Sequence, residues 1–115
     1  MTDHRKLKVW QLAQQVAEIV WRETMSCAPG LSMHTVRQIR TSSESVGANI
    51  AEGNRRTPKE FRRYLNIALG SANETDSHLV TLMNRGLIDL RIALQVRDDL
   101  ATLKRMIIAL QKTLL

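Results

Sequence analysis

The 115-residue sequence is poor in cysteine, proline and aromatic residues, with one cysteine, two prolines and 3% aromatics. Because Cys27 is alone, no disulfide can form within the chain, which favours a reducing, cytoplasmic setting. The charged N-terminus MTDHRKLKVW lacks the apolar run of a signal peptide, and no later window is apolar enough to span a bilayer. These absences predict a soluble cytoplasmic protein without a membrane partner.

Motifs for catalysis are also missing from the sequence. It contains no glycine-rich phosphate loop, no His-Glu-x-x-His motif and no cysteine cluster. A di-iron bundle needs Glu-x-x-His pairs on facing helices, and the nearest match, Glu74 with His78, has the wrong spacing and no second copy. Helical ribonucleases that pair Arg with a nearby downstream His are a rival class, but no arginine here precedes a histidine at that spacing. We therefore predict a non-enzymatic protein without metal or cofactor.

The sequence does contain four segments in which apolar residues recur every three or four positions. No segment alternates with the period of two that a half-buried strand requires. Short connections make sequential helices antiparallel neighbours. The pattern predicts an all-α, antiparallel up-down-up-down four-helix bundle, formed as one domain over residues 1–115. Its core stripes are Val9, Leu12, Val16 and Ile19, widened by Trp10, Ala13, Ala17 and Val20; Val36, Ile39, Ser43, Val46 and Ile50; Phe61, Leu65, Ala68, Ala72, Thr75, Leu79 and Leu82; and Ala93, Val96, Leu100, Leu103, Ile107, Leu110 and Leu114.

Breaks in the helical pattern agree with four helices. Ala28-Pro29-Gly30 should end the first helix, and Ser32 can cap the second. Gly53 suits the left-handed position just after a helix C-terminus. Thr57-Pro58-Lys59-Glu60 combines a capping threonine, a proline at the first helical position and a glutamate that can complete a capping box. Gly86 should end the third helix.

The outward face of the third helix carries Lys59 and Arg63 in its first two turns. Beyond them this face is small and neutral, as is that of the second helix, where a solvated helix usually carries Lys and Glu. One interpretation is a sparsely decorated surface, and the other is packing against further copies of the chain, which is common among symmetric oligomers. We favour homo-oligomer packing. The interface residues predicted in this way are Thr41, Ser45, Ala48, Asn66, Gly70, Asn73 and Ser77.

A basic cluster follows the second helix, and only Glu60 opposes it within residues 55–63. This stretch contributes +4 to a whole-chain net charge of +6. Cations at a helix N-terminus oppose the helix dipole, so helix stability does not explain them. Helix N-terminal amides and arginine forks both bind phosphate, which predicts a surface for RNA or DNA. The predicted nucleic-acid-binding residues are Arg55, Arg56, Lys59, Arg62 and Arg63, with Arg37, Arg40 and the Arg5-Lys6-Lys8 group as possible extensions.

Two other interpretations of the basic cluster stay open: a solvated surface and a contact for an acidic protein. The whole chain could then be a structural or protein-interaction module with no nucleic-acid binding. Tyr64 is the only aromatic residue nearby, and a single ring is a poor stacking platform. Any nucleic-acid binding should therefore be mainly to backbone and shape.

The segments QIRTSSESVGANIAEGNRR and EFRRYLNIALGSANE resemble the bacterial four-helix-bundle proteins encoded in intervening sequences of 23S ribosomal RNA genes. Asn-Ile-Ala-Glu-Gly at residues 49–53 is the most specific match, and LKVWQLA fits the family's opening. The resemblance implies a homopentameric ring of bundles without an established activity. A related branch, the accessory proteins of diversity-generating retroelements, implies nucleic acid and a reverse transcriptase as partners. Thr41 departs from the family pattern, which often has arginine there.

Overall fold

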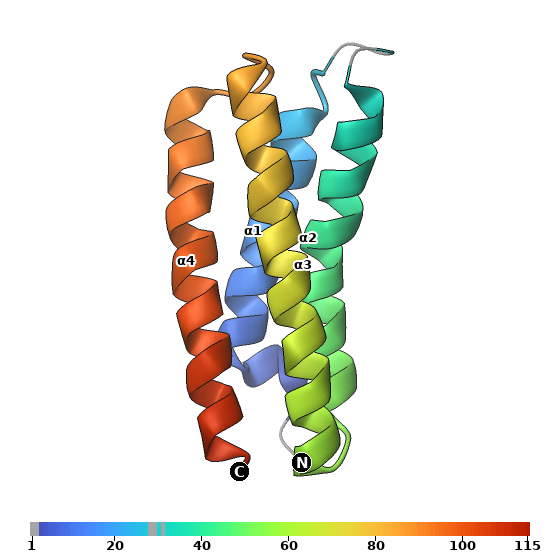
Figure 1. Cartoon of the computed structure of the whole chain (residues 1–115), viewed down its shortest axis with the longest axis vertical. Coiled ribbons are helices and arrows are strands. Elements are labelled where there is room, and N and C mark those ends of the chain that lie inside the picture. The colour runs from blue at the N-terminus through green and yellow to red at the C-terminus, as the bar shows by residue number, and fades with distance from the viewer. Residues whose placement is uncertain (1–2, 28–29, 31) are drawn as a thin grey trace.

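The computed structural model describes residues 3–27, 30 and 32–115, and within them the regular structure is helical. A short 3-10 turn, η1 (His4–Lys6), precedes α1 (Lys8–Thr24), α2 (Met33–Asn54), α3 (Pro58–Asn84) and α4 (Leu90–Thr113). Consecutive helices run antiparallel (Figure 1), and the contacting pairs α1–α2, α2–α3, α3–α4 and α1–α4 close the bundle. The molecule measures 43 × 22 × 20 Å. This arrangement confirms the predicted all-α four-helix bundle.

One hydrophobic core receives side chains from all four helices. Every predicted stripe residue of α2 and α3 is buried. In α1 the predicted stripe is buried at Val9, Ala13, Val16, Ala17 and Val20, and half-buried at Trp10, Leu12 and Ile19. In α4 the stripe is buried as far as Ile107 and half-buried beyond it. The helical period therefore identifies the core nearly residue by residue.

Hydroxyl side chains of α2 and α3 bond to one another where the two helices meet. Ser43 and Thr75 are both buried, and the Thr75 Oγ1 lies 2.9 Å from Ser42 Oγ and 2.8 Å from the Ser71 carbonyl oxygen. Ser45 Oγ and Ser71 Oγ are 2.9 Å apart across the same contact. In the part of the chain that the structure describes, no buried side-chain nitrogen or oxygen lacks a hydrogen-bond partner. These small hydroxyls let two long helices pack closely without leaving polar groups unsatisfied.

The predicted helix ends are confirmed in part. Glu60 N donates to Thr57 Oγ1 (3.2 Å) at the start of α3, and Gly86 adopts a φ of +67° just beyond its end. The first helix ends earlier than predicted, at Thr24, and Ala28-Pro29 lies outside the described residues. Ser32 occupies the N-cap position of α2, but its side chain makes no capping bond. Its hydroxyl accepts a hydrogen bond from Arg85 Nη1 (2.7 Å) instead.

The prediction that Gly53 lies beyond a helix end in the left-handed region is wrong. Gly53 is buried within α2, and the glycines with positive φ among the described residues are Gly30 and Gly86. A Cβ added at Gly53 would lie 2.6 Å from the Tyr64 Cβ and 2.8 Å from the Phe61 Cδ1. Glycine is needed here because the first turns of α3 press against the α2 backbone.

Replacing Gly53 by alanine should therefore destabilise the bundle, although alanine is the better helix former. The side chain would force α2 and α3 apart, at an expected cost of about 1–3 kcal/mol in the free energy of unfolding. Gly70→Ala is the matched control, because a Cβ at Gly70 meets nothing within 4 Å. It should gain up to about 1 kcal/mol from helix propensity. Urea denaturation followed by circular dichroism would measure both, and equal effects would contradict the packing argument.

Candidate nucleic-acid interface

The antiparallel topology brings three distant segments to one end of the bundle: the N-terminal segment, the α2–α3 turn and the end of α4 (Figure 1). Residues 3–8, 52–63 and 105–115 hold ten basic and three acidic side chains, whereas the rest of the chain holds seven and eight. We call this part of the molecule the basic end. Its net charge of +7 against −1 elsewhere means that the whole positive excess is concentrated there.

Part of the predicted cluster is neutralised by ion pairs at the α2–α3 turn. Arg55 Nη1 lies 3.7 Å from Glu52 Oε2, and Arg56 contacts both Glu52 and Glu60. The hydrogen bond from Arg56, with the charges of Arg56 and Arg55, lowers the pKa of Glu52 below its ordinary value. Glu52 is therefore ionised at neutral pH. The sequence prediction, which counted only Glu60, underestimated the acidic charge at the turn.

The remaining cations of the cluster line a groove between α3 and α4. The α3–α4 groove has a volume of about 510 Å³. None of its lining residues is acidic, and Lys59, Arg62, Arg63 and Lys112 have no ion-pair partner among the residues described. Among the described residues, these four cations are thus not paired with any carboxylate. The groove is lined by Lys59, Arg62, Arg63, Asn66, Ile108, Gln111, Lys112 and Leu115.

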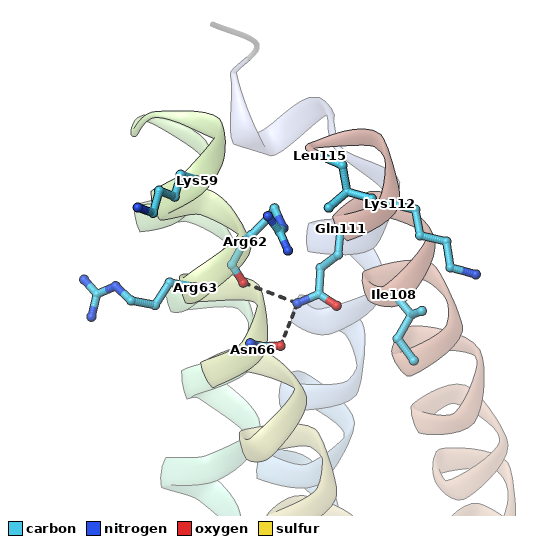
Figure 2. Close-up of a pocket in the computed structure, with 8 residues that line it drawn as sticks. All are labelled: Lys59, Arg62, Arg63, Asn66, Ile108, Gln111, Lys112 and Leu115. Atoms are coloured by element: carbon cyan, nitrogen blue, oxygen red, sulfur yellow. Dashed lines mark hydrogen bonds between the residues drawn. The ribbon is translucent and has the colours of Figure 1, made fainter.

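Figure 2 shows how these side chains lie. The Arg62 side chain extends over the space between the two helices, where Gln111 Nε2 donates to the Arg62 carbonyl oxygen (3.3 Å) and to Asn66 Oδ1 (2.8 Å). The Lys59 and Arg63 side chains point away from α4 on the far side of α3, and Lys112 points away from α3. Arg62 is therefore the cation that lies over the space between the helices, and the other three lie around its edges without converging on one point.

The nearby aromatic ring is not free. The Arg63 guanidinium carbon lies 5.2 Å from the centre of the Tyr64 ring, and that of Arg56 lies 5.6 Å from it. Both distances suit cation–π contacts. Two arginines thus occupy Tyr64, which agrees with the expectation that this residue is no base-stacking platform.

Arg37 and Arg40 do not extend the basic end, which corrects the sequence prediction. Both lie near the start of α2, and the 22-residue helix places them some 20 Å or more from the α2–α3 turn, at about 1.5 Å per residue. Arg40 stacks over the Trp21 ring at 4.1 Å and donates through Nε to the Thr24 Oγ1 at 2.8 Å. Its role is to join α1 to α2. The Arg5-Lys6-Lys8 group does lie at the basic end, with Arg5 paired to Asp3.

The residues predicted for an oligomer interface are divided by the structure. Ser45 is half-buried and bonded to Ser71, while Asn66 bonds to Gln111 and Asn73 Oδ1 accepts from Lys104 Nζ (3.1 Å). These three therefore make hydrogen bonds within the chain, although Asn66 and Asn73 are exposed. Thr41, Ala48, Gly70 and Ser77 are exposed too.

Sequence reasoning missed the α4 side of the groove: Ile108, Gln111, Lys112 and Leu115. They lie more than 40 residues from Arg62 in the sequence and form no motif with it. The signal that could have found them is topological, because the last turns of α4 must lie beside the first turns of α3 in an antiparallel bundle.

Other chemistry is not evident in the described part of the chain. Glu74 and His78 approach to 3.6 Å, but no group of three or more His, Cys, Asp or Glu side chains there could hold a metal ion. None of the described helices combines the length and the apolar character that crossing a membrane requires.

Fold and surface together define a small helical bundle with one strongly basic end. Residues 5–109 match the family model described as 23S rRNA-intervening sequence protein, and the chain belongs to this family. It is also similar to a crystal structure from Bacteroides thetaiotaomicron, a protein of unknown function from the S23 ribosomal protein family. That match has a TM-score of 0.81 and 27% identity, covering 90% of this chain and 98% of the other. No curated protein matches the sequence.

The contrast between Arg37 and Arg40 near the start of α2 can be tested by measuring stability. Arg40→Ala removes the contacts with Trp21 and Thr24, so we expect a loss of about 1–2 kcal/mol in the free energy of unfolding. Arg37→Ala is the matched control, because Arg37 is exposed on the same helix and should change stability by less than about 0.5 kcal/mol. Chemical denaturation followed by tryptophan fluorescence would measure both. A loss for Arg37→Ala as large as that for Arg40→Ala would argue against the assignment.

Proposed function

We propose that this protein is a non-enzymatic nucleic-acid-binding protein that contacts RNA or DNA backbone through its basic end. The observation that carries the proposal is the set of four cations around the α3–α4 groove without a carboxylate partner among the described residues. Placing like charges together costs free energy, and a polyanion relieves that cost. Arginine and lysine bind phosphate directly, the arginines through two parallel hydrogen bonds.

The distribution of the remaining charge supports the same proposal. Since the rest of the chain carries a side-chain net charge of −1, a polyanion is attracted to one end of the molecule and not to its whole surface. Because Arg55 and Arg56 are already in ion pairs, they should contribute less to the binding free energy of a polyanion. The largest contributions should come from Lys59, Arg62, Arg63 and Lys112. An acidic protein is the competing partner for this surface. A reverse-transcriptase partner stays a prediction from the resemblance.

Replacing Lys59, Arg62 and Arg63 by serine should weaken binding of a labelled oligonucleotide at least tenfold at low salt. Each lost phosphate contact also reduces counterion release, so the slope of log affinity against log salt should fall by about 2 for a single strand. Fluorescence anisotropy at several salt concentrations would measure both quantities.

The matched control replaces Arg22, Arg37 and Arg91 by serine. These exposed arginines lie at the opposite end of the bundle, and the change in net charge is the same. At about 0.1 M salt we expect the control to bind within about twofold of the unmodified protein, since charges beyond about 10 Å are largely screened at that ionic strength. Equal loss in both variants would indicate unspecific attraction, and no binding at low salt would refute the proposed function.

We also propose that the chain self-associates through the exposed outer faces of α2 and α3, the pentameric ring being the form expected from the resemblance. The outer face of α1, in contrast, is polar, with Lys8, Gln11, Gln15, Glu18 and Arg22 exposed. Small residues such as Ala48 and Gly70 permit close approach of another backbone. The Ile67 side chain on α3 is 43% exposed, and its burial in such a contact would add favourable hydrophobic free energy.

Ala48→Arg should dissociate such an assembly while leaving the bundle folded. Alanine and arginine have similar helix propensities and Ala48 is exposed, so the only large effect expected is steric and electrostatic exclusion of a neighbouring copy. Gln15→Arg on the polar face of α1 is the control. Light scattering of the unmodified protein should give a multiple of the 13.1 kDa chain mass. A monomer at micromolar concentration would contradict self-association.

A further inference from the structure

The geometry of the α3–α4 groove points to one class of nucleic acid, and we infer that the groove receives a single strand in preference to a duplex. This inference rests on the proposed function. It rests further on three features of the groove: the spread of its cations, the apolar side chains between them and the amides that join its walls.

The cations suit an extended ligand. A single phosphate ion would be held by donors that converge on one point, whereas Lys59 and Arg63 point away from α4 and Lys112 points away from α3 (Figure 2). Arg62 extends over the space between the two helices. A chain with a phosphate at every nucleotide, crossing from one helix to the other, could meet all four in succession.

The apolar side chains of the groove favour binding of a single strand over binding of a duplex. Ile108 is 43% exposed and Leu115 is 87% exposed, and both line the same groove as the four cations. A duplex presents phosphates and sugars at its surface and keeps its base faces stacked inside. A single strand brings an unstacked base with each phosphate, and that base can cover Ile108 and Leu115. Positive and apolar side chains thus line the same groove, as a ligand that carries both phosphates and accessible bases requires.

The floor of the groove supplies polar groups without charge. Gln111 and Asn66 are joined through Gln111 Nε2, which leaves Gln111 Oε1 without a hydrogen-bond partner among the described residues. Amide oxygens accept hydrogen bonds from base amino groups, and Asn66 Nδ2 can donate to base oxygens. Since Tyr64 is occupied by two arginines, the contacts with bases are aliphatic and few. Recognition should therefore tolerate any base sequence.

The test compares an oligothymidine, which forms no secondary structure, with a duplex containing the same number of phosphates. In the full-length protein, Ile108→Ser with Leu115→Ser should weaken oligothymidine binding about fivefold, because a base loses its apolar contact, and should change duplex binding by less than about twofold. The matched control is Met25→Ser with Leu90→Ser. These side chains are 67% and 61% exposed at the opposite end of the bundle, and their loss should change neither affinity.

Arg62→Ser with Lys112→Ser should weaken both ligands and reduce the salt slope for the single strand by about 1.4. Unchanged oligothymidine binding after the apolar substitutions would overturn the single-strand inference while leaving the proposed function intact. So would a duplex that binds the unmodified protein as tightly as the single strand. Competition by oligoglutamate as effective as by oligothymidine of equal charge would assign the groove to an acidic peptide. Failure of both nucleic acids to bind would refute the proposed function itself.

Discussion

The close contact between α2 and α3 is the constraint on which the rest of the molecule depends. Gly53 has no room for a Cβ beside Tyr64 and Phe61, and the hydroxyls of Ser42 and Thr75 meet farther along the same contact. Small residues here let two helices of 22 and 27 residues run side by side over most of their length. Because the contact begins at the turn itself, the first turn of α3 is fixed against the end of α2, and the basic side chains that follow are held on a rigid helix.

The same constraint explains why charge accumulates at one end. The turn brings Arg55 to Arg63 to the end of the bundle where the N-terminal segment and the end of α4 also lie. Cations at the start of α3 oppose its dipole, whereas Lys112 at the end of α4 agrees with the dipole of that helix. At the turn, Glu52 and Glu60 pair with Arg55 and Arg56 and so offset the unfavourable free energy of placing cations at the start of α3. The cations on the groove side receive no such compensation among the described residues, and this difference separates a structural part of the basic cluster from one available to a ligand.

How far the sequence predicts the molecule depends on the range of the interactions involved. The core stripes of α2 and α3 follow from helical periodicity alone, and the Thr57 cap from a local motif. Gly53 was misplaced because its requirement comes from a neighbouring helix and not from its own backbone angle. Arg40 was misassigned for a similar reason: its partners Trp21 and Thr24 lie on another helix. The α4 wall of the groove could not be found from spacing, since its link to Arg62 exists only through the topology.

Self-association and ligand binding would reinforce each other in an assembly of this protein. In a closed ring with cyclic symmetry, every subunit points the same way along the axis, so side-by-side packing through α2 and α3 would gather all basic ends on one face. Each end carries a side-chain net charge of +7, and their mutual repulsion opposes assembly at low ionic strength. A polyanion bound across several ends would remove that repulsion and would itself gain affinity from multiple contacts. By linkage, a ligand that binds the assembled form more tightly must also stabilise it. In the proposed assembly, the charge asymmetry of a single bundle would therefore couple self-association to nucleic-acid binding without any change in the fold of the subunit.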